Sequence, residues 1–185
     1  MRHEFVGFPK IARLNREIVV TEKLDGTNAQ LWILPEGETH TNGTRLLVGS
    51  RNRYISPESD NYGFARWAFN NYDELLGLGE GRHFGEWWGN GIQRGYNLKE
   101  KRFSLFNTAR WYNDEVRPKC CHVVPIIYTG LMEEFNPTVT MGHLAKTGSY
   151  AAKDYMKPEG IVIYHTASGQ LFKKTLEQDE KPKGY

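Results

Sequence analysis

Two strand-like runs of apolar and β-branched residues meet at a four-residue turn, and this junction constrains the fold more than any other feature of the chain. The runs Ile18–Leu24 and Ala29–Leu34 flank Asp25-Gly26-Thr27-Asn28. Gly26 and Asn28 tolerate the positive φ of tight turns, so the segment is predicted to form strand, turn and strand. Nineteen glycines and many short β-branched or aromatic runs extend this pattern along the chain.

The remaining elements follow from periodicity. Apolar residues at spacings of three and four predict an amphipathic helix over residues 62–77, and a weaker pattern predicts a second helix over 141–150. Further strands are predicted over residues 44–51, 82–88, 103–106, 122–128, 160–165 and 170–174. The charged tail, 177–185, is predicted to be mobile. No repeat or linker interrupts the chain, so residues 1–185 are expected to form one α+β domain rich in antiparallel sheet.

Composition narrows the class of protein. Lys plus Arg is 24 and Asp plus Glu is 22, a net charge of +2, which excludes a histone-like polycation but allows a locally basic groove. No run approaches the 18 apolar residues of a membrane span, and the first residues are too polar for a signal peptide. Adjacent Cys120 and Cys121 suit neither an ordinary structural disulfide nor a cysteine-based metal site. We therefore expect a soluble, cytoplasmic monomer without a membrane partner.

Lys23 ends the first strand beside the turn, where its amine can be held rigidly toward a cleft. An amine attacks phosphorus only when it is neutral, and nearby cations or a bound metal favour that form. Asp25 could orient the amine, and Gly26 permits the backbone to pass close to a ligand. A solvated hairpin with a surface lysine accounts for the same residues equally well, so this turn alone does not decide the function.

Three further patterns carry suitable chemistry. The step Ser50-Arg51-Asn52-Arg53 presents planar guanidinium donors that suit phosphate oxygens, although solvated arginines at a strand end explain it as well. Glu86, within Phe84-Gly85-Glu86-Trp87-Trp88, can accept hydrogen bonds from a vicinal diol. Strand alternation over 103–106 places Phe103 and Leu105 on one face and Ser104 and Phe106 on the other, where Phe106 could also pack in the core.

Two patterns lie near the end of the chain. Glu159 precedes the apolar run Gly160–His165, a position that an ordinary turn residue would also occupy. In Leu171-Phe172-Lys173-Lys174-Thr175, alternation puts Lys173 and Thr175 on one face and Lys174 on the other. We therefore expect Lys173 and Lys174 to point in opposite directions, and the role of Lys174 stays open. The six histidines are scattered and are expected to be structural or solvated.

In this order the motifs resemble the covalent nucleotidyltransferases, the superfamily of ATP-dependent polynucleotide ligases and mRNA capping enzymes. The Lys-x-Asp-Gly signature matches Lys23, Asp25 and Gly26, and Asn28 with its flanking residues looks most like the RNA ligase branch. The resemblance spans residues 8–175. It implies twisted antiparallel sheets with flanking helices around a nucleotide cleft, an ATP-grasp-like arrangement.

The resemblance also implies roles for individual residues. Lys23 would form a lysyl-N-AMP intermediate from ATP, with Asp25 and Lys173 as further catalytic residues and Glu159 organising Mg²⁺ or Mn²⁺. The nucleotide would be bound by Glu22, Lys23, Asn28, Arg51, Glu86, Phe106, Lys173 and Lys10, the last within Phe8-Pro9-Lys10-Ile11. Arg51 and Arg53 would contact the nucleic acid.

The expected partner is a nucleic acid with 5′-phosphate and 3′-hydroxyl ends, and RNA is preferred because the flanking residues resemble RNA ligases. A minimal DNA ligase is the alternative enzyme. A capping guanylyltransferase fits less well, since 185 residues leave no room for a second, oligonucleotide-binding domain. A nucleotide- or RNA-binding module without catalysis is the alternative from another class, although Lys23, Glu86, Glu159 and Lys173 are all present. Nick, single-strand and tRNA substrates are not distinguished.

Overall fold

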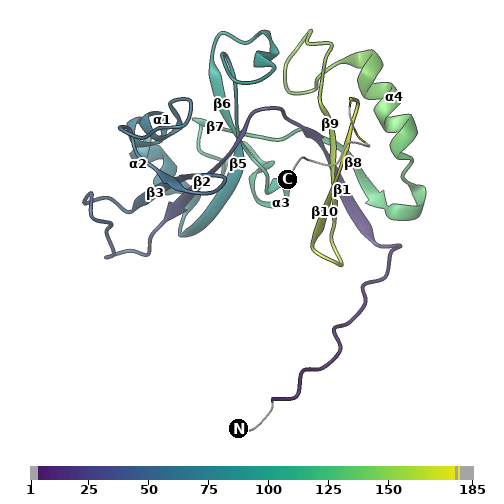
Figure 1. Cartoon of the computed structure of the whole chain (residues 1–185), viewed down its shortest axis with the longest axis horizontal. Helices are drawn as coiled ribbons and strands as arrows, with labels where there is room; N and C mark the ends of the chain where they lie inside the picture. The colour runs from purple at the N-terminus through teal and green to yellow at the C-terminus, as the bar shows by residue number, and fades with distance from the viewer. Residues whose placement is uncertain (1–3, 178, 180–185) are drawn as a thin grey trace.

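The strands form two separate sheets in the computed structural model, which describes residues 4–177 and 179 (Figure 1). The smaller sheet has the order β10-β9-β1-β8 and consists of β1 (Glu17–Lys23), β8 (Ile126–Leu131), β9 (Gly160–His165) and β10 (Gln170–Thr175). The larger sheet has the order β4-β3-β2-β5-β6-β7 and consists of β2 (Thr27–Ile33), β3 (Leu46–Ser50), β4 (Tyr54–Ile55), β5 (Gly81–Gly89), β6 (Lys101–Leu105) and β7 (Cys121–Val123). Every strand pair is antiparallel except β6 with β7, which confirms the predicted α+β class.

Helices cover one face of each sheet and lie at opposite ends of the molecule (Figure 1). Beside the larger sheet are α1 (Phe64–Asn70), α2 (Tyr72–Leu75) and the 3₁₀ turn η1 (Leu76–Leu78), and beside the smaller sheet is α4 (Pro137–Thr147). The short elements η2 (Gly95–Asn97), α3 (Thr108–Trp111) and η3 (Met132–Glu134) complete the structure. No helix of the described residues is long and apolar enough to cross a membrane.

Strand alternation divides each sheet into a packed face and an open face. On β2, Leu31 and Ile33 are buried against the α1–α2 side, and on β1, Ile18 and Val20 are buried against α4. Burial of each such aliphatic side chain contributes roughly 1.5–3 kcal/mol to the free energy of unfolding. The residues that alternate with them, such as Val19, Thr21 and Lys23 on β1, therefore project from the opposite faces.

The Lys23–Thr27 segment is not a hairpin, because β1 belongs to the smaller sheet and β2 to the larger one. The predicted turn is thus a crossing between sheets. Gly26 is not among the described glycines with positive φ, contrary to the expectation from turn chemistry. Glycine is required at position 26 for steric reasons. A Cβ here would collide with the Trp87 carbonyl oxygen and lie 2.7 Å from Trp88 Cβ.

Three predicted elements have different bounds in the structure. The helix predicted over 62–77 breaks at Asn71, whose side-chain amide donates to the Trp67 carbonyl at 2.8 Å and competes with helix continuation. The second helix begins earlier than predicted, at Pro137, because the Asn136 side chain caps it by accepting from the Thr138 and Val139 N–H groups. The strand predicted over 122–128 is two strands in different sheets, with Pro125 between them.

The first described residues lie outside the compact body of the protein. Residues 4–13 form no helix or strand and extend away from the sheets as an exposed arm (Figure 1). Lys10 lies in this arm and does not line the cleft, so the structure does not place it beside the other nucleotide-binding candidates. Of the tail predicted to be mobile, residues 178 and 180–185 lie outside the described residues.

Candidate functional site

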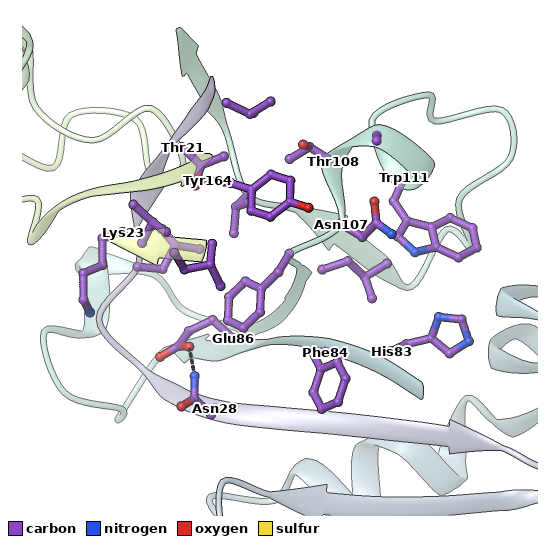
Figure 2. Close-up of a pocket in the computed structure, with 18 of the residues that line it drawn as sticks. Thr21, Lys23, Asn28, His83, Phe84, Glu86, Asn107, Thr108, Trp111 and Tyr164 are labelled. Atoms are coloured by element: carbon purple, nitrogen blue, oxygen red, sulfur yellow. Dashed lines mark hydrogen bonds between the residues drawn. The ribbon is translucent and has the colours of Figure 1, made fainter. Parts of the chain in front are cut away.

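The open faces of the two sheets enclose a cleft of about 1060 Å³, a volume at the upper end of the range for small-molecule sites. Both sheets contribute alternate residues to its walls, as does the segment around α3 (Figure 2). The smaller sheet supplies Val19, Thr21, Lys23, Val162, Tyr164 and Lys173, and the larger sheet supplies Asn28, Gln30, Arg82, Phe84 and Glu86, followed by Phe106. The predicted cleft between sheets is therefore present.

The Lys23 amine forms an ion pair with Glu159, at 2.6 Å between Nζ and Oε2. The sheet register creates this pair, because Lys23 lies opposite Gly160 on β9 and Glu159 directly precedes that strand. Both side chains are partly exposed, so a ligand in the cleft can reach them. The arrangement brings the candidate nucleophile and a candidate metal ligand together.

Glu86 is 8% exposed and is held by two hydrogen bonds, one from the crossing segment and one from the start of β2. Its Oε1 accepts from the Gly26 N–H at 3.1 Å, and its Oε2 accepts from the Asn28 amide at 3.0 Å (Figure 2). Burial raises the pKa of Glu86 to about 7, while the positive charge of Lys23 and these hydrogen bonds act in the opposite direction. Asn28 therefore fixes the orientation of Glu86 in addition to lining the cleft.

Lys173 and Lys174 point in opposite directions, as strand alternation predicts. Lys173 pairs with Val162, which also pairs with Thr21 of β1, so Lys173 shares the cleft face of the smaller sheet. Lys174 lies outside the cleft lining and its Nζ is 3.1 Å from Asp179 Oδ2. The cleft thus receives one lysine from β10.

Among the aromatic candidates, some side chains line the cleft and others are buried in the core. Phe106 lines the cleft at 42% exposure, whereas Phe103 is fully buried in the core of the larger sheet. Trp87 and Trp88 are buried and lie outside the cleft lining.

The two arginines after β3 also differ. Arg51 is exposed and lines the cleft. The Arg53 guanidinium instead donates to the Ser59 carbonyl at 3.2 Å and hydroxyl at 3.0 Å, so it braces its own loop. The structure therefore brings Arg51 to the cleft and does not bring Arg53 there.

Asp25 does not orient Lys23, contrary to the expectation. Its carboxylate pairs with Arg94, at 2.8 Å between Oδ2 and Nε, and its backbone N–H donates to the Tyr96 hydroxyl at 2.8 Å. The Arg94 guanidinium also donates to the Lys157 carbonyl at 3.3 Å, two residues before Glu159. We name Asp25, Arg94, Tyr96 and Lys157 the brace, because these contacts connect the segment after Lys23 to the segment before Glu159.

Sequence reasoning missed Arg94 and Tyr96. They lie in and directly after the glycine-rich segment Gly89–Gly95. Its glycine content is the sequence signal that could have drawn attention to this loop. Tyr96 has a φ of 53° and is fully buried between Trp88 and Tyr155, with ring centroids 4.8 and 4.6 Å away. Left-handed backbone at a bulky residue is unfavourable, and packing on both sides of the ring holds it there.

Glu22 is among the residues that line the cleft, and its buried carboxylate is also bound by the protein itself. Its carboxylate accepts from the Ser149 hydroxyl at 2.6 Å and from the Tyr150 and Ala151 N–H groups at 2.8 and 3.0 Å. Burial raises the pKa of Glu22, and these hydrogen bonds oppose the shift. The Glu22 side chain therefore fixes the loop after α4, since alternation points it away from the face that carries Lys23.

The metal-binding side chains at the cleft suit a divalent ion that is coordinated mainly by the bound substrate. No group of three or more potential metal-binding side chains occurs among the described residues. Mg²⁺ is commonly bound through one or two carboxylates together with substrate phosphates and water, so Glu159 at the cleft fits this mode. The cleft thus matches a metal that enters with a phosphorylated substrate.

Comparison with known proteins decides the family. Residues 16–175 match the family described as RNA ligase. The chain belongs to the RNA ligase family. Three solved forms of a Naegleria gruberi RNA ligase share its fold: two substituted forms with ATP and Mn (21% and 22% identity, TM-scores 0.62 and 0.60) and one with PPi (22%, 0.58). The matches cover 89%, 89% and 86% of this chain but 51%, 51% and 49% of the Naegleria chains, so this chain spans about half their length.

At these identities the structural likeness establishes the ligase fold and no more. No curated protein sequence matches the chain significantly. In this RNA ligase family member, Lys23, Glu86, Glu159 and Lys173 all belong to the cleft or its edge.

Proposed function

We propose that this chain is an ATP-dependent RNA ligase that self-adenylates on Lys23, transfers AMP to a 5′-phosphate end and seals that end to a 3′-hydroxyl. The position of Lys23 carries the proposal: its amine lies in the cleft, 2.6 Å from Glu159, on the same sheet face as Lys173. The Naegleria relatives solved with ATP and Mn support ATP as the nucleotide and a divalent metal as the cofactor.

The first step transfers an adenylyl group to the protein. The neutral Lys23 amine attacks the α-phosphorus of ATP, a P–N bond forms, and the bond from that phosphorus to the bridging oxygen breaks to release pyrophosphate. Glu159 is positioned to accept the amine proton. The Lys173 ammonium faces the same space and stabilises negative charge on the phosphate oxygens.

Two other residues bind the nucleoside. The ionised Glu86 carboxylate accepts hydrogen bonds from the ribose hydroxyls, and the Phe106 ring, half-exposed in the cleft, stacks on the base. Glu159 would be the protein ligand of a divalent ion, which would supply positive charge to stabilise the transferred group.

Two further displacements complete the reaction. An oxygen of the RNA 5′-phosphate attacks the phosphorus of lysyl-AMP and the P–N bond breaks. The leaving nitrogen takes back the proton from Glu159, which regenerates the Lys23 amine. The 3′-hydroxyl then attacks the 5′-phosphorus, and AMP leaves as the phosphodiester forms. Division of one difficult condensation into covalent steps is the general advantage of nucleophilic catalysis.

Covalent labelling tests this proposal. The protein is incubated with α-labelled ATP, GTP or NAD and Mg²⁺, and we expect label from ATP in the wild type and none in Lys23→Ala. Lys173→Ala and Lys174→Ala form a matched pair from neighbouring positions, of which only the first faces the cleft. We expect loss of label in Lys173→Ala and retention in Lys174→Ala. Absence of label with every nucleotide would contradict the proposal and favour a binding module.

The choice of RNA over DNA needs a separate measurement. Nicked duplexes that differ only in ribose or deoxyribose at the 3′-hydroxyl end are offered with the same 5′-phosphate strand. We expect faster sealing of the ribose end. Equal or faster sealing of the deoxyribose end would instead favour a minimal DNA ligase.

A further inference from the structure

A row of half-exposed aromatic side chains crosses the open face of the larger sheet. Tyr54 pairs with Gly49, Gly49 with Gln30, and Gln30 with Phe84, while the Phe106 N–H donates to the Phe84 carbonyl at 2.9 Å. Residues paired across strands share a face. Tyr54, Phe84 and Phe106 are 50%, 51% and 42% exposed, so three rings are presented to solvent along one line.

No side chain projects from the middle of this row, because the residue there is Gly49. A Cβ at Gly49 would lie 2.8 Å from Cγ of Gln30, so glycine lets the Gln30 side chain lie across β3. Gln30 and Phe84 both line the cleft. The row therefore continues the cleft wall past Phe106, the residue proposed to hold the ATP base.

A second cross-strand pair on the same face lies two residues further along β2 and β5. Trp32 is paired with Arg82, whose Cζ lies 3.9 Å from the centre of the Trp32 ring. An arginine held over an indole presents a planar cationic group, and the long 3.4 Å contacts of Arg82 with Gln30 and Tyr54 connect it to the first row. Arg82 is exposed and also lines the cleft.

The chemistry of this face suits an unpaired nucleic acid strand. Unpaired bases stack on aromatic rings and on guanidinium planes, while bases inside a duplex are hidden from such side chains. Arg51 and Arg82 supply positive charge along the same cleft wall, as a phosphate backbone requires. The face is too wide for one nucleotide, because its pairs span strands β4, β3, β2 and β5, about 4.8 Å apart at each step.

We propose that Tyr54, Phe84 and the Arg82–Trp32 pair form a stacking platform that binds unpaired ribonucleotides of the RNA end to be joined. This inference rests on the proposed function and extends it from the nucleotide to the RNA strand. Tyr54 and Phe84 receive bases, and Arg82 supplies both a stacking plane and a charge for the backbone.

Fluorescence anisotropy with a labelled oligouridylate that lacks a 5′-phosphate measures this binding without ligation. We expect Tyr54→Ala and Phe84→Ala to raise the Kd by about 5- to 150-fold each, the contribution of one stacked base. Tyr112→Ala is the matched control, since Tyr112 is 62% exposed and lies outside the cleft lining. We expect Tyr112→Ala to bind as the wild type does.

The salt dependence separates stacking from charge. Arg82→Ala should weaken binding and reduce the slope of log K against log salt by about 0.7, the value for one phosphate contact with a single strand. Tyr54→Ala should weaken binding and leave the slope unchanged. Arg82→Lys should retain the slope but lose affinity, because a lysine lacks the stacking plane.

Three results would overturn the platform: equal affinity of all variants, an equal loss in Tyr112→Ala, or tighter binding of blunt duplex RNA that the variants weaken equally. Wild-type protein that takes label from ATP but does not bind oligouridylate also overturns the platform and leaves the proposed function intact. Protein that binds oligouridylate through Tyr54 and Phe84 but takes no label supports the platform and overturns the proposed function.

Discussion

The Lys23 amine lies 2.6 Å from the Glu159 carboxylate, although 136 residues separate the two in the chain. The pairing of β1 with β9 produces this contact, because Lys23 and Gly160 are opposite each other at the end of the ladder. The proposed nucleophile is thus positioned by sheet register, which is stiffer than a loop. The crossing segment that follows is held separately by the brace.

The brace should position the reacting groups without contacting the nucleotide. Arg94→Ala removes the partner of Asp25 and the donor to Lys157, so both segments that flank the site become looser. We expect the rate constant of self-adenylation to fall by about 10- to 100-fold with a smaller change in the ATP concentration for half-maximal rate. Arg66→Ala, at an exposed arginine of α1, is the control and should match the wild type. A change in ATP affinity alone would contradict this role.

Tyr96→Phe tests the other half of the brace. The change removes the hydroxyl that accepts from the Asp25 N–H and retains the buried ring. An unsatisfied buried N–H costs about 1–3 kcal/mol, and we expect the free energy of unfolding in urea to fall by this amount. An unchanged free energy of unfolding would show that this hydrogen bond contributes nothing.

Glu86 should make stability depend on pH. Burial raises its pKa from the ordinary value of 4.5 to about 7 in the folded protein, so the folded protein retains a proton that the unfolded chain releases between these values. The free energy of unfolding should therefore fall as pH rises from 4.5 to 7, by about 3 kcal/mol. Urea unfolding at several pH values measures this fall. Glu86→Gln should flatten the profile, and identical profiles for both proteins would refute the assignment.

Gly26→Ala should distort the crossing between sheets. The added methyl group would collide with the Trp87 carbonyl and with Trp88, which are backbone and buried side-chain atoms that cannot move aside cheaply. We expect loss of covalent labelling and a lower thermal midpoint. Gly142→Ala, where a Cβ meets nothing within 4 Å, is the matched control and should behave as the wild type in both measurements.

Glu22 should be a structural residue despite its place beside Lys23. Glu22→Ala leaves the Ser149 hydroxyl and the Tyr150 and Ala151 N–H groups without their acceptor. We expect the free energy of unfolding to fall by about 3 kcal/mol, while Glu22→Gln, which keeps one acceptor oxygen, should lose less. Equal losses in the two variants would show that the charge, rather than the hydrogen bonds, stabilises the loop.

The sequence pattern predicted which side chains of a strand share a face. Strand alternation alone separates Lys173 from Lys174 and Phe106 from Phe103, because a period of two fixes the face of each side chain. The motif order then predicts the family and the cleft.

Partners that depend on distant segments could not be predicted. Asp25 is two residues from Lys23, yet its partners are Arg94 and Tyr96, the latter 71 residues away. The same limit made a crossing between sheets look like a hairpin, since turn residues do not reveal which sheet each flanking strand joins. Lys10 illustrates the reverse case, because a matching motif does not fix the position of an exposed arm that lies outside the cleft lining.

Intact mass spectrometry followed by peptide mapping tests the central claim most directly. After incubation with ATP and Mg²⁺, we expect the mass of the protein to increase by one adenylyl group, located on Lys23. Pyrophosphate should remove the adduct and regenerate ATP. An adenylyl group on another lysine, or an unmodified protein when Lys173 and Glu159 are intact, would contradict the account.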